Sequence, residues 1–227
     1  MKAYILYNPQ QKSLDYARAC FDSFSGFDTW EPILFSGCNP TVLKEYDDKY
    51  NISDNRSKWE KDDERYESKK SCFYSHFELW LKVIENNAVT AIVEHDTRCI
   101  GDLPDNLKFN GAIQLCIESA ARLKHKAIRE KDYGRLIGRE DGVHPMDISR
   151  EINGYTPMIS NMAYAITPEA AKILVDDCIK NGWYQNDELI TTKYFDIGYI
   201  LPSVIEYDKS LELGTSINYS WGDSVNG

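Results

Sequence analysis

The triplet Glu94-His95-Asp96 stands directly after the apolar run Val89–Val93. A short apolar run of this length is typical of a buried strand, and side chains two residues apart on a strand point the same way. We therefore expect the carboxylates of Glu94 and Asp96 to converge where the strand ends. Ligands bind at such strand ends in open α/β sheets, and paired carboxylates suit a divalent cation that also holds phosphate oxygens. Taken alone, the two acids could equally be solvated loop residues.

The segment before that strand has the pattern of an amphipathic helix, which we expect to run from residue 71 to residue 85 and to pack on a sheet. Its apolar side chains recur at helical spacing, and they are Phe73, Phe77, Trp80, Leu81 and Ile84. Ser75 and His76 fall on the flank of this apolar stripe. On pattern alone, a serine and a histidine there are helix-surface residues with local hydrogen bonds.

Strands and helices alternate along the chain. The further elements that we expect are strands at 2–7, 31–35, 111–117 and 162–166, and helices at 14–24 and from residue 168 onwards. Thr167 is suited to be the N-cap of the last helix, Pro168 its first residue and Gly182 its end. This order predicts an α/β fold with a mostly parallel central sheet, and 227 residues suffice for one domain spanning 1–227.

These motifs together resemble a known glycosyltransferase family, the one that includes lipooligosaccharide galactosyltransferases and collagen galactosyltransferases. The resemblance lies in a helix with Cys-x-x-Ser-His-x-x-Leu-Trp at 72–80 and a strand ending in Glu-x-Asp at 94–96. It resumes at 161–171, which is similar to the family's small-residue strand entering a helix. The chain departs from the family pattern where Ser71 replaces a glycine and His95 replaces the middle acid of Glu-Asp-Asp.

The resemblance implies a GT-A-type, Rossmann-like domain. It implies inverting transfer of a hexose or pentose from a nucleotide sugar, UDP-linked, to a hydroxyl of a glycan or other acceptor. Mn²⁺ or Mg²⁺ would be held by Glu94 and Asp96, with Asp96 the more important, because the final acid of such triplets usually meets the metal. Ser75 and His76 would shape the donor pocket. His95 would turn away with the opposite strand face, or would itself approach the metal.

A further donor contact is expected from Asn8, which stands at the end of the first predicted strand and so at the carboxyl edge of the sheet. The resembled family usually carries arginines shortly after this strand. This chain has Asn-Pro-Gln-Gln-Lys at 8–12, with Arg18 further on. The donor contacts of this region therefore differ from the family pattern.

The resemblance also places an acidic residue after the last predicted helix, where Asp187 and then Glu188 stand. Inverting transfer needs a carboxylate that removes the proton of the acceptor hydroxyl, and Asp187, with Glu188 second, is the candidate. The other interpretation is that Asn186 or Asp187 caps a helix running through Leu189 to Tyr194. One residue can serve both purposes.

Trp183 and Tyr184 precede these acids. Their rings would offer an apolar face to an acceptor sugar, or would lie in the core, as most aromatic side chains do. The net charge of −10 argues against broad binding to nucleic acid, so a saccharide or glycan acceptor is favoured over modified DNA.

Length and composition set further bounds on the class of protein. No run is apolar enough to span a membrane, and the N-terminus has the pattern of a strand rather than of a signal sequence, so we expect a soluble, cytoplasmic protein. The six cysteines are scattered, with no Cys-x-x-Cys, which indicates reduced thiols.

Three segments fall outside the regular pattern. Residues 54–70 are highly charged and are expected to form an exposed helix or a mobile loop. Residues 122–150 are basic and rich in glycine, which favours a loop that folds over the donor or faces the acceptor, or else a solvated charged surface. The tail at 214–227 is rich in Ser, Asn and Gly and is expected to be mobile.

Two other functions fit the same acidic pair. A nucleotidyl- or phosphotransferase would also use it, but the sequence has neither a Gly-x-x-x-x-Gly-Lys-Ser/Thr loop nor a Gly-x-Gly-x-x-Gly turn to hold phosphates. A non-catalytic module that binds a nucleotide or sugar on the same fold is the remaining alternative, because the triplet is altered at its middle position.

Overall fold

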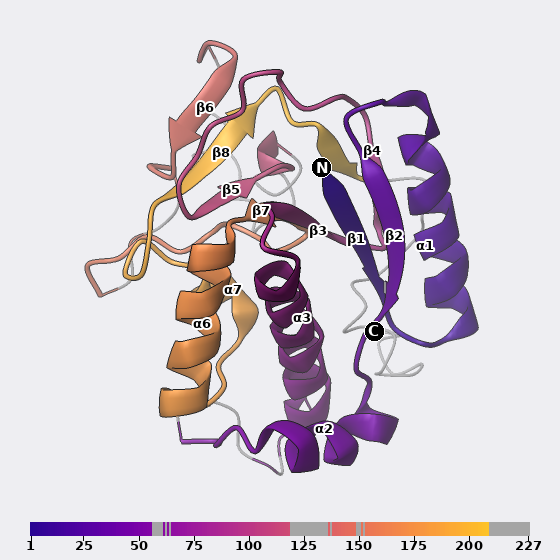
Figure 1. Cartoon of the computed structure of the whole chain (residues 1–227), viewed down its shortest axis with the longest axis vertical. Coiled ribbons are helices and arrows are strands. Elements are labelled where there is room, and N and C mark those ends of the chain that lie inside the picture. The colour runs from indigo at the N-terminus through magenta and orange to yellow at the C-terminus, as the bar shows by residue number, and fades with distance from the viewer. Residues whose placement is uncertain are drawn as a thin grey trace, which may run out of the picture.

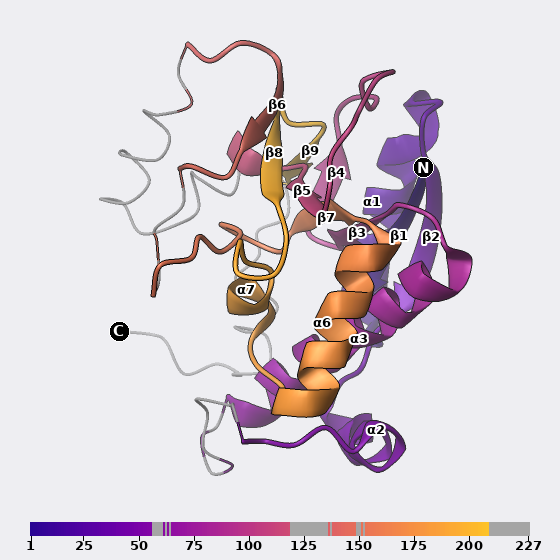
Figure 2. The same ribbon diagram turned by 60° about the vertical axis from the view of Figure 1, so that its left-hand side comes forward.

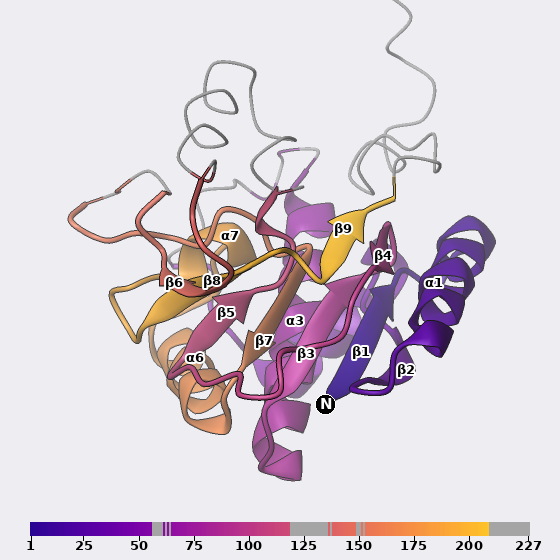
Figure 3. The ribbon, with the colours of Figure 1, turned by 90° about the horizontal axis from the view of Figure 1, so that it is seen from above.

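A seven-stranded sheet with the strand order β2-β1-β3-β7-β5-β8-β6 organises the chain (Figure 3). The computed structural model describes residues 1–55, 61, 63, 65–118, 136, 138–148, 151 and 153–208, apart from the side chain of Asp187. The strands of this sheet are β1 (Lys2–Tyr7), β2 (Glu31–Ser36), β3 (Thr90–Glu94), β5 (Ala112–Gln114), β6 (Gly142–Pro145), β7 (Ala163–Ile166) and β8 (Ile197–Leu201). A second, two-stranded sheet pairs β4 (Thr97–Cys99) with β9 (Ile205–Tyr207).

The helices are α1 (Gln11–Ser23), α2 (Leu43–Tyr50), α3 (Tyr66–Asn86), α6 (Pro168–Asn181) and α7 (Asn186–Leu189), with short 3₁₀ turns η1 (Phe24–Gly26) and η2 (Pro40–Val42). Helices α3 and α6 pack side by side against the sheet (Figures 1 and 2). The connection β1-α1-β2 and the connection β2-α3-β3, which passes β1, cross the sheet in opposite directions. Because both parallel crossovers are right-handed, α1 and α3 cover opposite faces.

Five of the seven strands run in one direction. β1 is parallel to β2 and β3, β5 is parallel to β8, and β7 and β6 run the opposite way to their neighbours. The α/β fold with a mostly parallel central sheet, predicted from the sequence, is therefore confirmed. Because β7 is antiparallel to β3 and β5, the start of β7 lies at the same edge of the sheet as the ends of those two strands.

The elements with strong sequence signals fall where they were expected. Thr167 is the N-cap of α6, and its Oγ1 accepts a hydrogen bond from the Ala170 N–H at 3.2 Å, with Pro168 as the first helical residue. The helix ends at Gly182, whose φ of 93° favours glycine, and a Cβ there would lie 2.5 Å from the Ser53 carbonyl oxygen. Because Gly182 has no side chain, the segment after α2 that contains Ser53 can pack closely against the end of α6.

Helix α3 begins five residues earlier than predicted, at Tyr66 rather than Ser71. Its first turns contain Lys70, whose side chain is only 3% exposed and whose Nζ lies 2.8 Å from Asp47 Oδ1 and 2.9 Å from Asp54 Oδ1. Tyr66 and Trp183 both donate to the same Asp54 oxygen, each at 2.6 Å. We call these five residues the Lys70 network. They fix the start of α3 through contacts that are distant in sequence.

Other predicted elements changed length. The strand expected at 111–117 is only Ala112–Gln114, because the chain then bends and the Leu115 N–H donates to the Ala163 carbonyl at 3.0 Å. The predicted segments 54–70 and 122–150 lie partly outside the described residues, and the tail at 214–227 lies wholly outside them. Within the described part, no helix has the length and apolar character needed to cross a membrane.

Candidate active site at the carboxyl edge of the sheet

Glu94 is the last residue of β3 and lies at the middle of the sheet edge. It pairs with Leu6 of β1, and its own N–H donates to the Met162 carbonyl at 2.7 Å, just before β7 begins. The next residue, His95, donates its N–H to the Leu6 carbonyl at 3.1 Å. The strand end is therefore fixed on both sides by backbone hydrogen bonds, which gives the Glu94 carboxylate a defined position.

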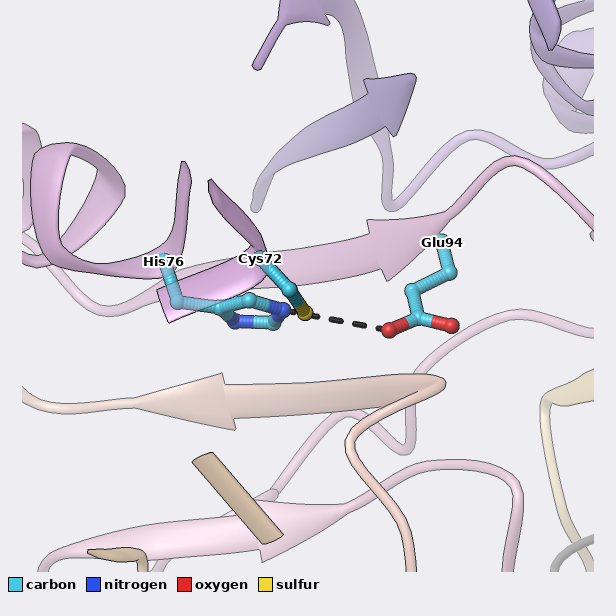
Figure 4. Close-up of side chains that lie close together, drawn as sticks. All are labelled: Cys72, His76 and Glu94. Atoms are coloured by element: carbon cyan, nitrogen blue, oxygen red, sulfur yellow. Dashed lines mark ion pairs between the residues drawn. The ribbon is translucent and has the colours of Figure 1, made fainter. Parts of the chain in front are cut away.

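The Glu94 side chain faces helix α3, where it meets Cys72 and His76 (Figure 4). Because Cys72 and His76 are four residues apart on a helix, they project from the same face. One ligand atom from each of the three residues lies within 4.8 Å of the other two, and His76 Nε2 is 3.8 Å from Glu94 Oε1. We call these residues the Cys72–His76–Glu94 group.

Two core residues orient the His76 ring. Its Nδ1 lies 2.8 Å from Tyr164 Oη, and the same oxygen accepts the Trp80 indole N–H at 3.0 Å. The Tyr164 hydroxyl can donate to Nδ1 or accept a hydrogen bond from it, so this contact is compatible with either tautomer of the His76 ring. The other ring nitrogen, Nε2, faces Glu94.

Asp96 lies just beyond the strand end and is 8% exposed. Its Oδ1 has no hydrogen-bond partner among the described residues. Burial, and then the negative charge of Glu94, raise the pKa of Asp96 to about 7. Burial also acts to raise the pKa of Glu94, but His76, His95 and Lys69 together outweigh it and hold that pKa below its usual value. A cation would relieve the repulsion between the two carboxylates and complete the partners of Asp96.

His95, between these acids, turns to the other face of the sheet. Its buried ring stacks on Tyr16 of α1, with the ring centroids 6.4 Å apart and the planes 20° from parallel. This is the orientation that strand alternation favoured. The departure from the family's acidic triplet therefore lies on the side away from the Cys72–His76–Glu94 group.

The two remaining donor candidates differ from each other. Asn8 follows β1, and its buried Oδ1 has no hydrogen-bond partner among the described residues. The Ser75 hydroxyl is bonded within the protein, because it donates to the Ser71 carbonyl at 2.9 Å and accepts the Cys38 N–H at 2.9 Å. In this structure Ser75 fixes the loop after β2 onto α3, and direct contact of its hydroxyl with a donor stays a prediction.

Buried side-chain polar atoms without partners gather at this edge. Within the described residues they belong to Asn8, Ser71, His76, Asp96, Gln114, Asn161 and Asn186. Gln114 ends β5 and Asn161 leads into β7, so both lie at the edge where β1 and β3 end. Buried polar groups are normally hydrogen-bonded, and a set of them without partners at one strand edge is typical of a site that a ligand or water completes.

Helix α7 docks beside this site. Its N-cap is Gln185, which makes no side-chain cap hydrogen bond, so the prediction that Asn186 or Asp187 caps the helix is wrong. The buried Asn186 instead donates from Nδ2 to the Cys72 carbonyl at 3.2 Å. The helix ends at Leu189 rather than continuing to Tyr194, and the Asp187 side chain lies outside what the structure describes.

A cavity of about 300 Å³ lies next to α7. Tyr184 and Glu188 both line it, and Glu188 accepts a hydrogen bond from Gln185 Nε2. Trp183 does not line it. Its ring is fully buried against Tyr66, and the tryptophan belongs to the Lys70 network, so its place is the core, which the sequence left open as an alternative to a sugar platform.

Comparison with known proteins decides the family. Residues 28–190 match the model of Glycosyltransferase family 25 (LPS biosynthesis protein), which is more than half of the chain. The chain belongs to glycosyltransferase family 25. The match confirms the resemblance inferred from the helix and strand-end motifs, and it includes α3, β3 and α7.

Solved structures of glycosyltransferases resemble this family 25 chain more distantly. One is the galactosyltransferase LgtC in complex with donor and acceptor sugar analogues, at 9% identity over 98% of this chain and 92% of that chain, with a TM-score of 0.44. Another is mouse xyloside xylosyltransferase 1 in its apo form, at 7% identity over 84% of this chain and 80% of that chain, with a TM-score of 0.37. No curated protein matches the chain.

Three residues of this family 25 site did not emerge as candidates from the sequence. Cys72 was noted only as one residue of the Cys-x-x-Ser-His motif. Its position four residues before His76 is nevertheless a signal that the two side chains share one face of the helix. Tyr164 lies in the resembled segment 161–171, but nothing in the sequence connects its hydroxyl to His76. Asn161 carries no local signal, because its position becomes meaningful only through the antiparallel placement of β7.

Proposed function

We propose that the chain transfers a sugar from a nucleotide donor, UDP-linked, to a hydroxyl of a saccharide or glycan acceptor, with inversion at the anomeric carbon. The observation that carries the proposal is the convergence of Glu94, Asp96 and the partnerless polar groups of Asn8 and His76 at one strand edge of a family 25 chain. Polar atoms at this edge suit the phosphates and ribose of a nucleotide.

Mn²⁺ or Mg²⁺ fits the acidic residues of this edge. Both ions prefer oxygen ligands, and the buried Oδ1 of Asp96 lacks a partner beside a second carboxylate. Asp96 and Glu94 would hold the ion. When bound, it supplies positive charge that stabilises the departing diphosphate.

Donor binding falls to the residues on the β1 and α3 sides. We assign the Asn8 amide to the nucleotide because its buried Oδ1 lacks a partner, and we assign His76, 3.8 Å from Glu94, to orienting that carboxylate. Ser75 contributes by fixing the loop after β2, as its two backbone hydrogen bonds support. His76 is fully buried, and the low dielectric around it strengthens its contact with Glu94.

The acceptor side lies at α7. In an inverting displacement the acceptor oxygen attacks the anomeric carbon from the face opposite the diphosphate, the bond to the diphosphate oxygen breaks, and the hydroxyl proton passes to a carboxylate. Asp187 is the proposed base, with Glu188 second. Glu188 lines the cavity beside Tyr184, whose ring would pack against the acceptor sugar. Trp183, buried in the core, has no part in acceptor binding.

The non-catalytic alternative rests on the altered triplet. His95 replaces the middle acid, but its ring packs on Tyr16 on the other face of the sheet. The replacement therefore removes no ligand from the side that Glu94 occupies. This arrangement favours an active enzyme over a binding module.

A nucleotide-release assay tests the proposal. The chain is incubated with UDP-, GDP- and CDP-linked hexoses and pentoses, with manganese or with a chelator, and free nucleotide is measured with and without a mixture of saccharide acceptors. We expect release from UDP-sugars alone, dependent on manganese and increased by acceptor. Asp105→Asn, at an exposed acid, is the control for general charge effects. A donor that binds but is never cleaved would instead establish the non-catalytic module.

A further inference from the structure

We propose that Cys72, His76 and Glu94 form a binding site for a borderline-soft divalent cation such as Zn²⁺. The three residues offer a thiolate sulfur, an imidazole nitrogen and a carboxylate oxygen, which are the ligand types that zinc takes in proteins. This site is distinct from the all-oxygen site proposed for manganese or magnesium, although both would use Glu94.

The geometry is close to that of a three-ligand zinc site. In tetrahedral coordination, ligand atoms at the usual zinc distances lie about 3.3 to 3.6 Å from one another. His76 Nε2 and Glu94 Oε1 are already 3.8 Å apart, and all three atoms lie within 4.8 Å of one another. Cys72 and His76 share one face of α3, so the helix holds two of the ligands in place. Three protein ligands leave a fourth position for water or a substrate.

An independent observation points to a ligand at this place. His76 is fully buried, yet its Nε2 has no hydrogen-bond partner among the described residues and faces Glu94. A metal ion bound by Cys72 and Glu94 would complete this ring nitrogen. Tyr164 holds the other nitrogen at 2.8 Å, which is the support that ligating histidines usually have.

The proton balance is simple. On binding, the Cys72 thiol releases one proton to solvent, and the neutral His76 ring binds the ion through Nε2 and carries its hydrogen on Nδ1. The Nδ1–H then donates to Tyr164 Oη, which accepts the Trp80 N–H at the same time. A hydroxyl has two acceptor positions, so Tyr164 can accept both hydrogen bonds.

Access distinguishes Cys72 from the other cysteines. All six cysteines lie within the described residues, and five are buried while Cys72 is half-buried. The Glu94 side chain is 26% exposed, so solvent reaches the group from that side. A thiolate favours zinc over manganese and magnesium, which prefer oxygen. The group therefore selects for a different ion than the carboxylate pair does.

One consequence rests on the proposed function. Glu94 belongs to both proposed sites. A zinc ion bound to Cys72 and His76 would occupy the Glu94 carboxylate, which could then no longer hold manganese together with Asp96. Zinc and the manganese-dependent donor would then exclude one another. Inhibition by zinc that Cys72→Ser relieves is the expected sign of this competition.

Titration of the metal-free full-length chain with Co²⁺, followed by Zn²⁺, tests the site without any nucleotide. Cobalt bound through a thiolate gives a charge-transfer absorption band in the near ultraviolet. We expect one equivalent of cobalt, a thiolate band, and its loss on adding zinc. Cys72→Ser should abolish the band, and Cys99→Ser, at a buried cysteine outside the group, should leave it unchanged.

A second variant separates ligation from folding. Tyr164→Phe keeps the packing of the ring but removes the oxygen that supports His76, so the thiolate band should remain while cobalt affinity falls about 10- to 100-fold. A wild-type chain without a thiolate band, or a band that survives in Cys72→Ser, would overturn the proposal. Because no donor is present, either result leaves the proposed transferase function untouched.

Discussion

Two polar clusters among the described residues are completed in different ways. In the Lys70 network every described charge has a partner, since the Lys70 ammonium lies within 3 Å of both Asp47 and Asp54. At the carboxyl edge of the sheet, Asn8, His76 and Asp96 each keep a buried polar atom without one. The first cluster holds two helices and a loop together, and the second keeps polar atoms that a ligand or water would complete.

The pKa values show the same contrast. Burial acts to lower the pKa of Lys70, but its hydrogen bonds with Asp47 and Asp54 outweigh burial and raise it. Burial acts to raise the pKa of Asp54, and the hydrogen bonds from Tyr66 and Lys70 reverse that effect and lower it. At Asp96 burial prevails. A network that keeps its charges stabilises the fold, whereas the carboxylate of Asp96, which burial and repulsion both disfavour, is the residue at which we propose a cation.

The largest expected effect separates activity from stability at the sheet edge. Asp96→Asn should lower sugar transfer at least about 1000-fold, equivalent to about 4 kcal/mol of transition-state stabilisation. It should leave the free energy of unfolding unchanged or slightly increased, because it removes a carboxylate that Glu94 repels. Donor turnover and urea unfolding, measured on one preparation, give both quantities. Full activity in this variant would end the metal role of Asp96.

Lys70→Met should do the reverse. It leaves Asp47 and Asp54 without their shared cation, and we expect a loss of about 3 kcal/mol in the free energy of unfolding. The estimate is at the lower end for a broken buried ion pair, because the two acids are 39% and 30% exposed. Urea denaturation measures it, with Lys44→Met, which removes an exposed i,i+4 pair, as the matched control. Equal stability of the two variants would contradict the role of the network.

Trp183→Phe sharpens the same comparison. It keeps an aromatic ring in the core but removes the Nε1–H that donates to Asp54 at 2.6 Å, so unfolding should become easier by about 1 to 2 kcal/mol. Acceptor KM should not change. Tyr184→Ala, at the cavity, should raise acceptor KM with little effect on stability. A Trp183 variant with raised acceptor KM and normal stability would restore the tryptophan to the acceptor site.

The smallest effect is a dependence on pH. The pKa of Asp54 is lowered in the folded chain, so the stability that its charge contributes is present above the unfolded pKa of about 3.9 and is lost as the pH falls towards the folded value. Wild type should therefore be more stable than Asp54→Asn at pH 6, and the difference should shrink below about pH 4. Chemical denaturation of both proteins across this range measures the gap. A gap independent of pH would mean that shape rather than charge matters at this position.

Local signals in the sequence determined much of the fold. The apolar run before Glu94 predicted β3, and Thr167, Pro168 and Gly182 predicted both ends of α6. The start of α3 was placed too late, because burial of a lysine there depends on acids that only the folded chain brings near. Strands β4, β6, β8 and β9 were not predicted, since segments of three to five residues carry little periodicity.

The same distinction holds for the site. Glu94 and Asp96 could be chosen as site candidates from the sequence, because side chains two residues apart at a strand end point the same way. The grouping of Cys72 with His76 and Glu94, the support from Tyr164 and the burial of Trp183 arise from packing between distant segments. Alternation along β3 correctly favoured turning His95 away from Glu94, and the stack on Tyr16 supplies the partner that the sequence could not name.

The central claim is that a metal ion and a nucleotide bind at the carboxyl edge of the sheet, where Asn8, His76 and Asp96 keep polar atoms without partners. Isothermal titration of UDP, GDP and CDP into the wild-type chain and Asp96→Asn, with and without manganese, tests this claim most directly. The account predicts binding of UDP that requires manganese, is lost in Asp96→Asn, and persists in Lys70→Met at a temperature where that variant is folded. Binding of no nucleotide, or binding that ignores both manganese and Asp96, would contradict it.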